Sequence, residues 1–68
     1  MSEGYYRIGA AARLLGISPY HLRRLCEAQL VEGVLLPSGQ RRVPVSEVER
    51  LLKEGIPPIP QGLLVLQR

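Results

Sequence analysis

The feature that most restricts the fold is a helix stop followed at once by a helix start, at residues 16–19. Gly16 suits the left-handed conformation that ends a helix, and Ser18-Pro19 joins a serine N-cap to a proline at the first helical position. Apolar residues recur at helical spacing on both sides of this break: Ile8, Ala11, Ala12 and Leu15 before it, and Leu22, Leu25 and Cys26 after it. The sequence therefore predicts two short helices, the second over about residues 19–28, joined by a tight turn as in a helix-turn-helix.

The next part of the chain has the pattern of a β-hairpin followed by a third helix. Residues 34–36 have strand composition, residues 37–40 are turn residues, and 41–43 return, with Pro44 ending that strand at an edge. The capping box of Ser46 and Glu49 then predicts a helix start, and Gly55 its end. Its expected inward stripe is Val48, Leu51 and Leu52, and its expected surface pairs are Glu49–Lys53 and Arg50–Glu54.

The predicted fold class is mainly α with a small β-hairpin wing: a winged helix-turn-helix of three helices plus the wing. Residues 5–57 form the predicted domain, and residues 58–68 form a proline-rich and apolar C-terminal tail.

The charges of the 68-residue chain are unevenly placed. Nine basic and six acidic residues give a net charge of +3, yet residues 4–26 contain four arginines and no acid. Residues 33–46 are also free of acids and contain Arg41 and Arg42. Two separate arginine-rich segments are typical of a protein that contacts a polyanion at two places. Solvated surface arginines would give the same composition, so charge alone leaves both interpretations open.

Composition argues against catalysis and metal binding. The chain has one histidine, one cysteine, no aspartate and no glycine-rich phosphate loop, so we expect no enzyme activity, no cofactor and no metal site. Cys26 is expected to be a small buried residue. Because no apolar run reaches the length of a membrane span and the N-terminus lacks a signal-peptide pattern, we expect no membrane partner and a cytoplasmic location.

Three segments together resemble the MerR and excisionase families. Residues 6–24 (YRIGAAARLLGISPYHLRR) are similar to their N-terminal motif, and residues 37–43 (PSGQRRV) to their wing. Residues 46–57 (SEVERLLKEGIP) are similar to the end of small single-domain BldC-like regulators. The resemblance implies a winged helix-turn-helix that binds double-stranded DNA, with the second helix in the major groove and the wing on the adjoining backbone or minor groove.

The resemblance also implies which residues contact DNA. Arg23 and Arg24 match the family's paired arginines on the second helix, Arg41 and Arg42 match those of the wing, and Tyr20 and His21 fall on the variable reading positions. On a helical wheel Tyr20 and Arg24 lie most directly opposite the apolar stripe, with Arg23 and His21 at its flanks. The candidate DNA-binding residues are Ser18, Tyr20, His21, Arg23, Arg24, Ser38, Gln40, Arg41 and Arg42.

Some of these positions have a second interpretation or depart from the family pattern. Ser18 is first a helix cap and only secondarily a phosphate contact. Residues 41 and 42 alternate faces of a strand, so at most one points the same way as the reading helix. Gln40 stands where the wing usually has histidine, and Val43 where it has tyrosine, so the wing tip is expected to contact DNA differently.

Two functions from different classes remain open at this point. The first is sequence-specific DNA binding, as a small transcription regulator or an excisionase-like architectural factor, with copies on adjacent sites joined through the tail and no small-molecule effector. The second is a MerR-like module that binds another protein, which the apolar run from Leu63 to Leu66 favours. The acid-free arginine segments favour the first.

Overall fold

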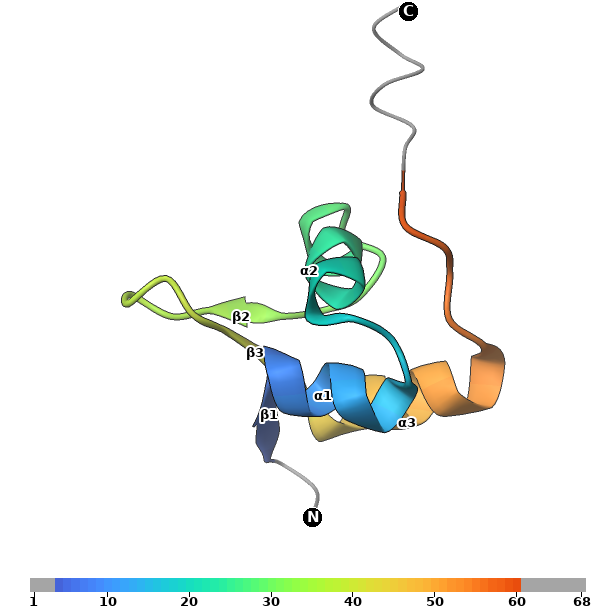
Figure 1. Ribbon diagram of the computed structural model, residues 1–68. Coiled ribbons are helices and arrows are strands. Elements are labelled where there is room, and N and C mark those ends of the chain that lie inside the picture. Colours follow the sequence, from blue (N-terminus) through green and yellow to red (C-terminus); the bar gives the residue numbers. More distant parts are fainter. Residues whose placement is uncertain (1–3, 61–68) are drawn as a thin grey trace, which may run out of the picture.

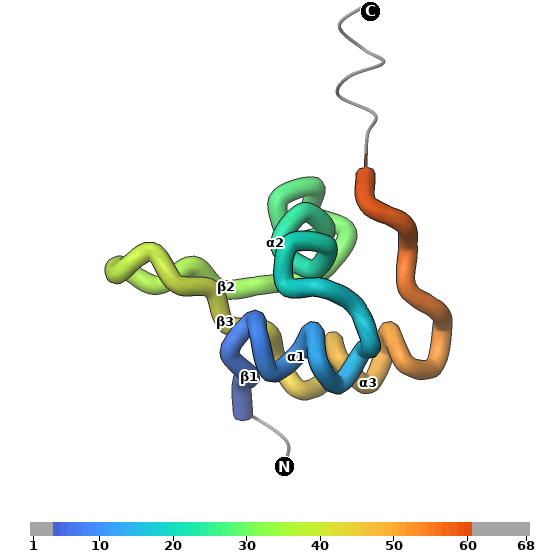
Figure 2. The backbone as a smooth tube through the Cα atoms, in the orientation of Figure 1, coloured from blue at the N-terminus to red at the C-terminus, as the bar shows by residue number. Residues whose placement is uncertain are grey.

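The computed structural model describes residues 4–60. In chain order the elements are β1 (Tyr5–Arg7), α1 (Ile8–Leu15), α2 (Pro19–Glu27), β2 (Val34–Leu35), β3 (Arg41–Pro44) and α3 (Val45–Glu54). Helices α1 and α3 lie side by side, α2 packs on α1, and the hairpin of β2 and β3 projects away from the helices (Figures 1 and 2). The expected fold class, mainly α with a small β wing, is confirmed.

The turn between α1 and α2 forms as the sequence predicts. Gly16 adopts the left-handed conformation with φ of 75°, and the N–H of Ile17 donates to the carbonyl of Ala12 at 3.0 Å. The Oγ atom of Ser18 then accepts from the N–H of His21 at 3.0 Å, and α2 begins at Pro19. Local sequence signals therefore fix where the first helix ends and the second begins.

An apolar cluster lies between the helices and β3. Ala11 and Ala12 have no exposed surface, and such small side chains allow two helices to approach closely. The predicted α2 stripe is buried as expected, and burial raises the pKa of the Cys26 thiol. The buried residues are Ala11, Ala12, Leu15, Leu22, Leu25, Cys26, Val31, Val43, Val48 and Leu51.

The wing belongs to a three-stranded antiparallel sheet with the order β1-β3-β2. Besides the predicted hairpin it includes β1, in which Tyr5, Tyr6 and Arg7 pair with Pro44, Val43 and Arg42. β3 is consequently the central strand, and the expected place of Pro44 at an edge is wrong. The proline is tolerated there because it is the last residue of β3, and β2 pairs only with Arg41 and Arg42.

Helix α3 begins two residues earlier than the capping box predicts, and that prediction is wrong. Pro44 is the N-cap residue, and Ser46 lies inside the helix. No side chain among residues 4–60 caps this helix. The reason is that β3 leads directly into α3, where the N–H of Val45 donates to the carbonyl of Gly4 at 3.1 Å. The chain before β1 thus satisfies an amide at the start of the helix.

The predicted inward stripe of α3 is also only partly correct. Val48 and Leu51 are buried, but Leu52 is 60% exposed. The face of α3 that packs on α1 and β3 is therefore narrower than the apolar stripe in the sequence. The predicted Arg50–Glu54 pair forms at 3.2 Å. Among residues 4–60, no ion pair joins Glu49 to Lys53.

A polar network joins α3 to the segment that follows α2. Arg50 Nη2 donates to Glu47 Oε1 at 2.8 Å and to the carbonyl of Leu30 at 3.2 Å, and Glu47 Oε1 also accepts from the N–H of Glu32 at 3.1 Å. The hydrogen bond from Arg50 is the largest cause that lowers the pKa of Glu47. These bonds hold the chain in place where it leaves α2 for the wing.

We expect the change Glu47→Gln to lower the free energy of unfolding by about 1 kcal/mol at neutral pH, because it removes a charge-assisted hydrogen bond. The folded-state pKa of Glu47 lies below its unfolded value of about 4.3, so this stabilisation is present above that value and is lost as the pH falls through the folded pKa. Urea denaturation at neutral and at strongly acidic pH measures the difference between the two proteins. An equal difference at both pH values would contradict the ion pair.

Candidate nucleic-acid interface

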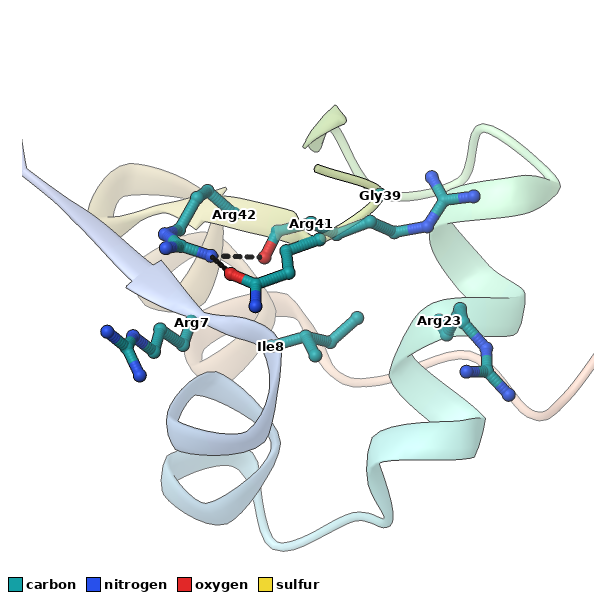
Figure 3. Close-up of a pocket in the computed structure, with 7 residues that line it drawn as sticks. Arg7, Ile8, Arg23, Gly39, Arg41 and Arg42 are labelled. Carbon is teal, nitrogen blue, oxygen red and sulfur yellow. Dashed lines mark hydrogen bonds between the residues drawn. The ribbon is translucent and has the colours of Figure 1, made fainter. Parts of the chain in front are cut away.

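A basic hollow lies between α2 and the wing (Figure 3). Its volume is about 290 Å³, and β1, the start of α1, α2 and the wing all contribute to its lining. Arginines predominate among the lining residues, which are Arg7, Ile8, Arg23, Gly39, Gln40, Arg41 and Arg42. The structure therefore gathers arginines that are far apart in the sequence around one open cavity.

Two of these arginines lie directly opposite each other in the sheet. The register pairs Arg7 with Arg42, and like charges at opposed positions of an antiparallel pair destabilise it. Arg42 Nη1 donates to Gln40 Oε1 at 3.3 Å and to the carbonyl of Arg41 at 3.4 Å, both of which are uncharged acceptors. Within residues 4–60 neither Arg7 nor Arg42 forms an ion pair. An anion bound beside them would relieve their repulsion.

The two wing arginines point in different directions, as strand alternation predicts. In Figure 3 the side chain of Arg41 extends toward α2, whereas that of Arg42 lies beside β1. Arg41 Nη2 lies 3.9 Å from Glu27 Oε2 on α2. Both nevertheless border the same hollow, so two arginines of the wing contribute to its lining rather than one.

The exposed face of α2 carries Tyr20, Arg23 and Glu27. Tyr20 is 53% exposed, as expected for a residue opposite the buried stripe. The guanidinium of Arg23 lies 5.8 Å from the centre of the Tyr20 ring. Arg23 follows Tyr20 by three residues and Glu27 follows Arg23 by four, spacings that bring side chains onto one helix face. Glu27 was absent from the candidate residues. Its helical spacing from Tyr20 and Arg23 is the sequence signal that could have identified it.

Arg24 does not lie outermost on α2, and that prediction is wrong. Its side chain is 30% exposed, whereas Arg23 is the exposed member of the pair. The chain after α3 turns back beside α2, as the orange segment of Figures 1 and 2 shows. Arg24 Nη2 donates to the carbonyl of Pro60 at 3.2 Å, and its buried Nε has no hydrogen-bond partner within the described residues.

His21 contacts the same returning segment. Its Nε2 lies 2.7 Å from the carbonyl oxygen of Pro57, a hydrogen bond in which the protonated Nε2 donates. His21 and Arg24 are three residues apart on one flank of α2, and their acceptors are also three residues apart. Proline-rich chain favours the polyproline II conformation, whose period of three residues places such carbonyls on one side. We call residues 57–60 the strap, since they cover this flank.

The remaining candidate residues occupy the turns. Ser18 acts as the helix cap, and both Ser38 and Gln40 are exposed in the wing turn. That turn is closed by Gly39, whose φ of 95° suits a glycine and whose N–H donates to the carbonyl of Leu36 at 2.8 Å. Arg7 was not among the candidates. It lies in the acid-free segment of residues 4–26, but its place at the hollow depends on the β1–β3 pairing.

Comparison with known protein families places residues 5–55 in one of them. This span, which contains all six elements, matches a family described as Helix-turn-helix domain. The chain belongs to this family. Membership in the helix-turn-helix family supports DNA as the partner and agrees with the excisionase part of the resemblance. Comparison with curated proteins and with solved structures finds no match.

Two further observations concern other kinds of site in this helix-turn-helix protein. Among the described residues, no helix combines the length and the apolar character needed to cross a membrane. Across residues 4–60, histidine, cysteine and acidic side chains form no cluster of three that could hold a metal ion. The apolar run from Leu63 to Leu66 lies outside the described residues.

We expect the strap to protect the Nε–H of Arg24 from exchange with solvent, because that atom is buried. NMR of the arginine Nε–H groups should show severalfold slower exchange for Arg24 than for Arg23. Replacing Pro58 and Pro60 together by glycine loosens the strap and should bring the two rates together. Equal rates in the unaltered protein would contradict the contact between the strap and α2.

Proposed function

We propose that this helix-turn-helix protein binds double-stranded DNA at specific sequences, as a small transcription regulator or an excisionase-like architectural factor. Helix α2 would enter the major groove, and the wing would contact the adjacent backbone or minor groove. The observation that carries the proposal is the hollow between these two elements, which is bordered by Arg7, Arg23, Arg41 and Arg42. The family match independently supports DNA as the partner.

The arginines divide into two roles by their positions. Arg23 stands on the exposed face of α2, and a guanidinium in the major groove can donate two hydrogen bonds to guanine. Arg7 and Arg42 stand on the sheet beside the helix, where their repulsion makes a bound phosphate favourable. In this proposal Arg23 reads sequence, while Arg7 and Arg42 fix the position of the backbone.

The remaining candidate residues take smaller parts in the proposal. Tyr20 is exposed beside Arg23 and would contact base edges or thymine methyl groups. Ser38 and Gln40 lie at the wing turn and would approach the backbone. His21 and Arg24 are held by the strap, so their contact with DNA would be limited to the side of α2 that the strap leaves open.

Binding by several copies on adjacent sites stays a prediction. A single small domain usually has limited affinity for DNA, so we expect further copies to contribute. The segment expected to join them, residues 61–68, lies outside the described residues.

We expect Arg23→Ala to weaken binding to a duplex selected from random sequences by about 1–3 kcal/mol and to relax the preference at one position. Lys53→Ala is the matched control, since it removes one positive charge from an exposed position on α3. Fluorescence anisotropy with the selected duplex and with a scrambled duplex measures both effects. If the two variants lose the same affinity, or if the protein binds no duplex, the proposal is wrong.

A further inference from the structure

A carboxylate of α2 contacts the basic interface. Glu27 lies on the exposed face of α2, and within residues 4–60 it is the residue whose carboxylate pairs with the arginines of α2 and the wing. Its Oε1 lies 3.4 Å from Arg24 Nη1, and its Oε2 lies 3.9 Å from Arg41 Nη2. The carboxylate thus bridges the reading helix and the wing.

The two arginines are held unequally. Besides its pair with Glu27, Arg24 donates a hydrogen bond to the carbonyl of Pro60. Within residues 4–60 the side chain of Arg41 has its polar contact with Glu27 alone. Glu27 is 42% exposed, and exposed pairs at such distances are weak and screened by salt. A DNA phosphate can therefore displace the carboxylate of Glu27 from Arg41, but only when the phosphate lies within contact distance of the Arg41 guanidinium.

A carboxylate on a groove-facing helix also selects among bases. It is repelled by phosphates and by the acceptor atoms of base edges, and it gains a hydrogen bond only where an amino group such as cytosine N4 is presented. Such a carboxylate increases specificity because it repels most duplexes and is offset by a hydrogen bond only on duplexes that present a donor to it.

We propose that Glu27 is a specificity-determining residue, which restrains Arg41 from indiscriminate phosphate contact and opposes binding to duplexes that offer its carboxylate no donor. This inference rests on the proposed DNA-binding function. It predicts that Glu27 lowers affinity for arbitrary DNA more than affinity for the preferred site.

The test compares Glu27→Gln with the unaltered protein on the selected and the scrambled duplex, over a range of salt. We expect affinity for the scrambled duplex to rise about three- to tenfold, with a smaller change for the selected duplex. The slope of log affinity against log salt should steepen by about 1 for the scrambled duplex, because Arg41 becomes free. Glu27→Asp keeps the charge and should keep most of the discrimination.

Two controls separate this role from simple charge or stability. Glu49→Gln makes the same charge change at an exposed position of α3 and should leave the ratio of the two affinities unchanged. In an Arg41→Ala background, Glu27→Gln should lose most of its effect on the scrambled duplex, as coupled residues do in a double-mutant cycle. Thermal unfolding of each variant checks that it is folded.

A second pair of variants tests the inference without altering Glu27. Arg41 pairs with a carboxylate, whereas Arg42 donates to uncharged acceptors, so Arg42→Ala should weaken binding to the scrambled duplex more than Arg41→Ala does. The inference is overturned if Arg41→Ala costs as much, if Glu27→Gln raises both affinities equally, or if Glu49→Gln has the same effect. If the unaltered protein binds no duplex, the proposed function fails and the inference with it.

Discussion

The packing of α2 on α1 is the contact on which the whole interface depends, because it decides which side of the second helix is free. Leu22 and Leu25 are fully buried, and burial of each contributes about 1.5–3 kcal/mol. Helix α2 can pack closely on α1 because Ala11 and Ala12 are small side chains on the facing helix. With the apolar stripe of α2 facing inward, Tyr20 and Arg23 face solvent. The strap and the wing contact other residues of α2, namely His21, Arg24 and Glu27.

The second constraint is the pairing of β1 with β3. It brings Arg7 to a position opposite Arg42, an arrangement that costs energy in the absence of an anion. Local arrangements that break a rule of stability are expected at functional sites. The same pairing buries Val43 and makes the wing part of the domain, so that its arginines are held at a fixed position relative to α2.

Local features were predictable from the sequence, and features that depend on distant residues were not. The signals for the α1–α2 turn lie within four residues, from Gly16 to Pro19, and the structure follows them. The start of α3 was missed because Gly4, some forty residues away in the chain, supplies the acceptor for its first amide. The end of α2 gave no glycine signal either, since Gln29 takes the left-handed conformation there with φ of 64°.

The candidate site shows the same division. Helical and family-like spacing made Tyr20, Arg23 and the wing arginines candidates, and the structure places them at the candidate interface. Arg24 was misplaced, because a helical wheel contains no information on the strap that covers it. Arg7 and Glu27 were missed for the same reason: their places at the candidate site come from contacts with β3 that only the fold brings together.

The central claim is that DNA contacts the face formed by α2 and the wing, and NMR titration of the labelled protein with a selected duplex tests it most directly. The account predicts that the largest shifts fall on Arg7, on Tyr20 and Arg23, and on residues 39–42, with little change along the exposed side of α3. Shifts concentrated on α3, or spread evenly over the domain, would contradict it.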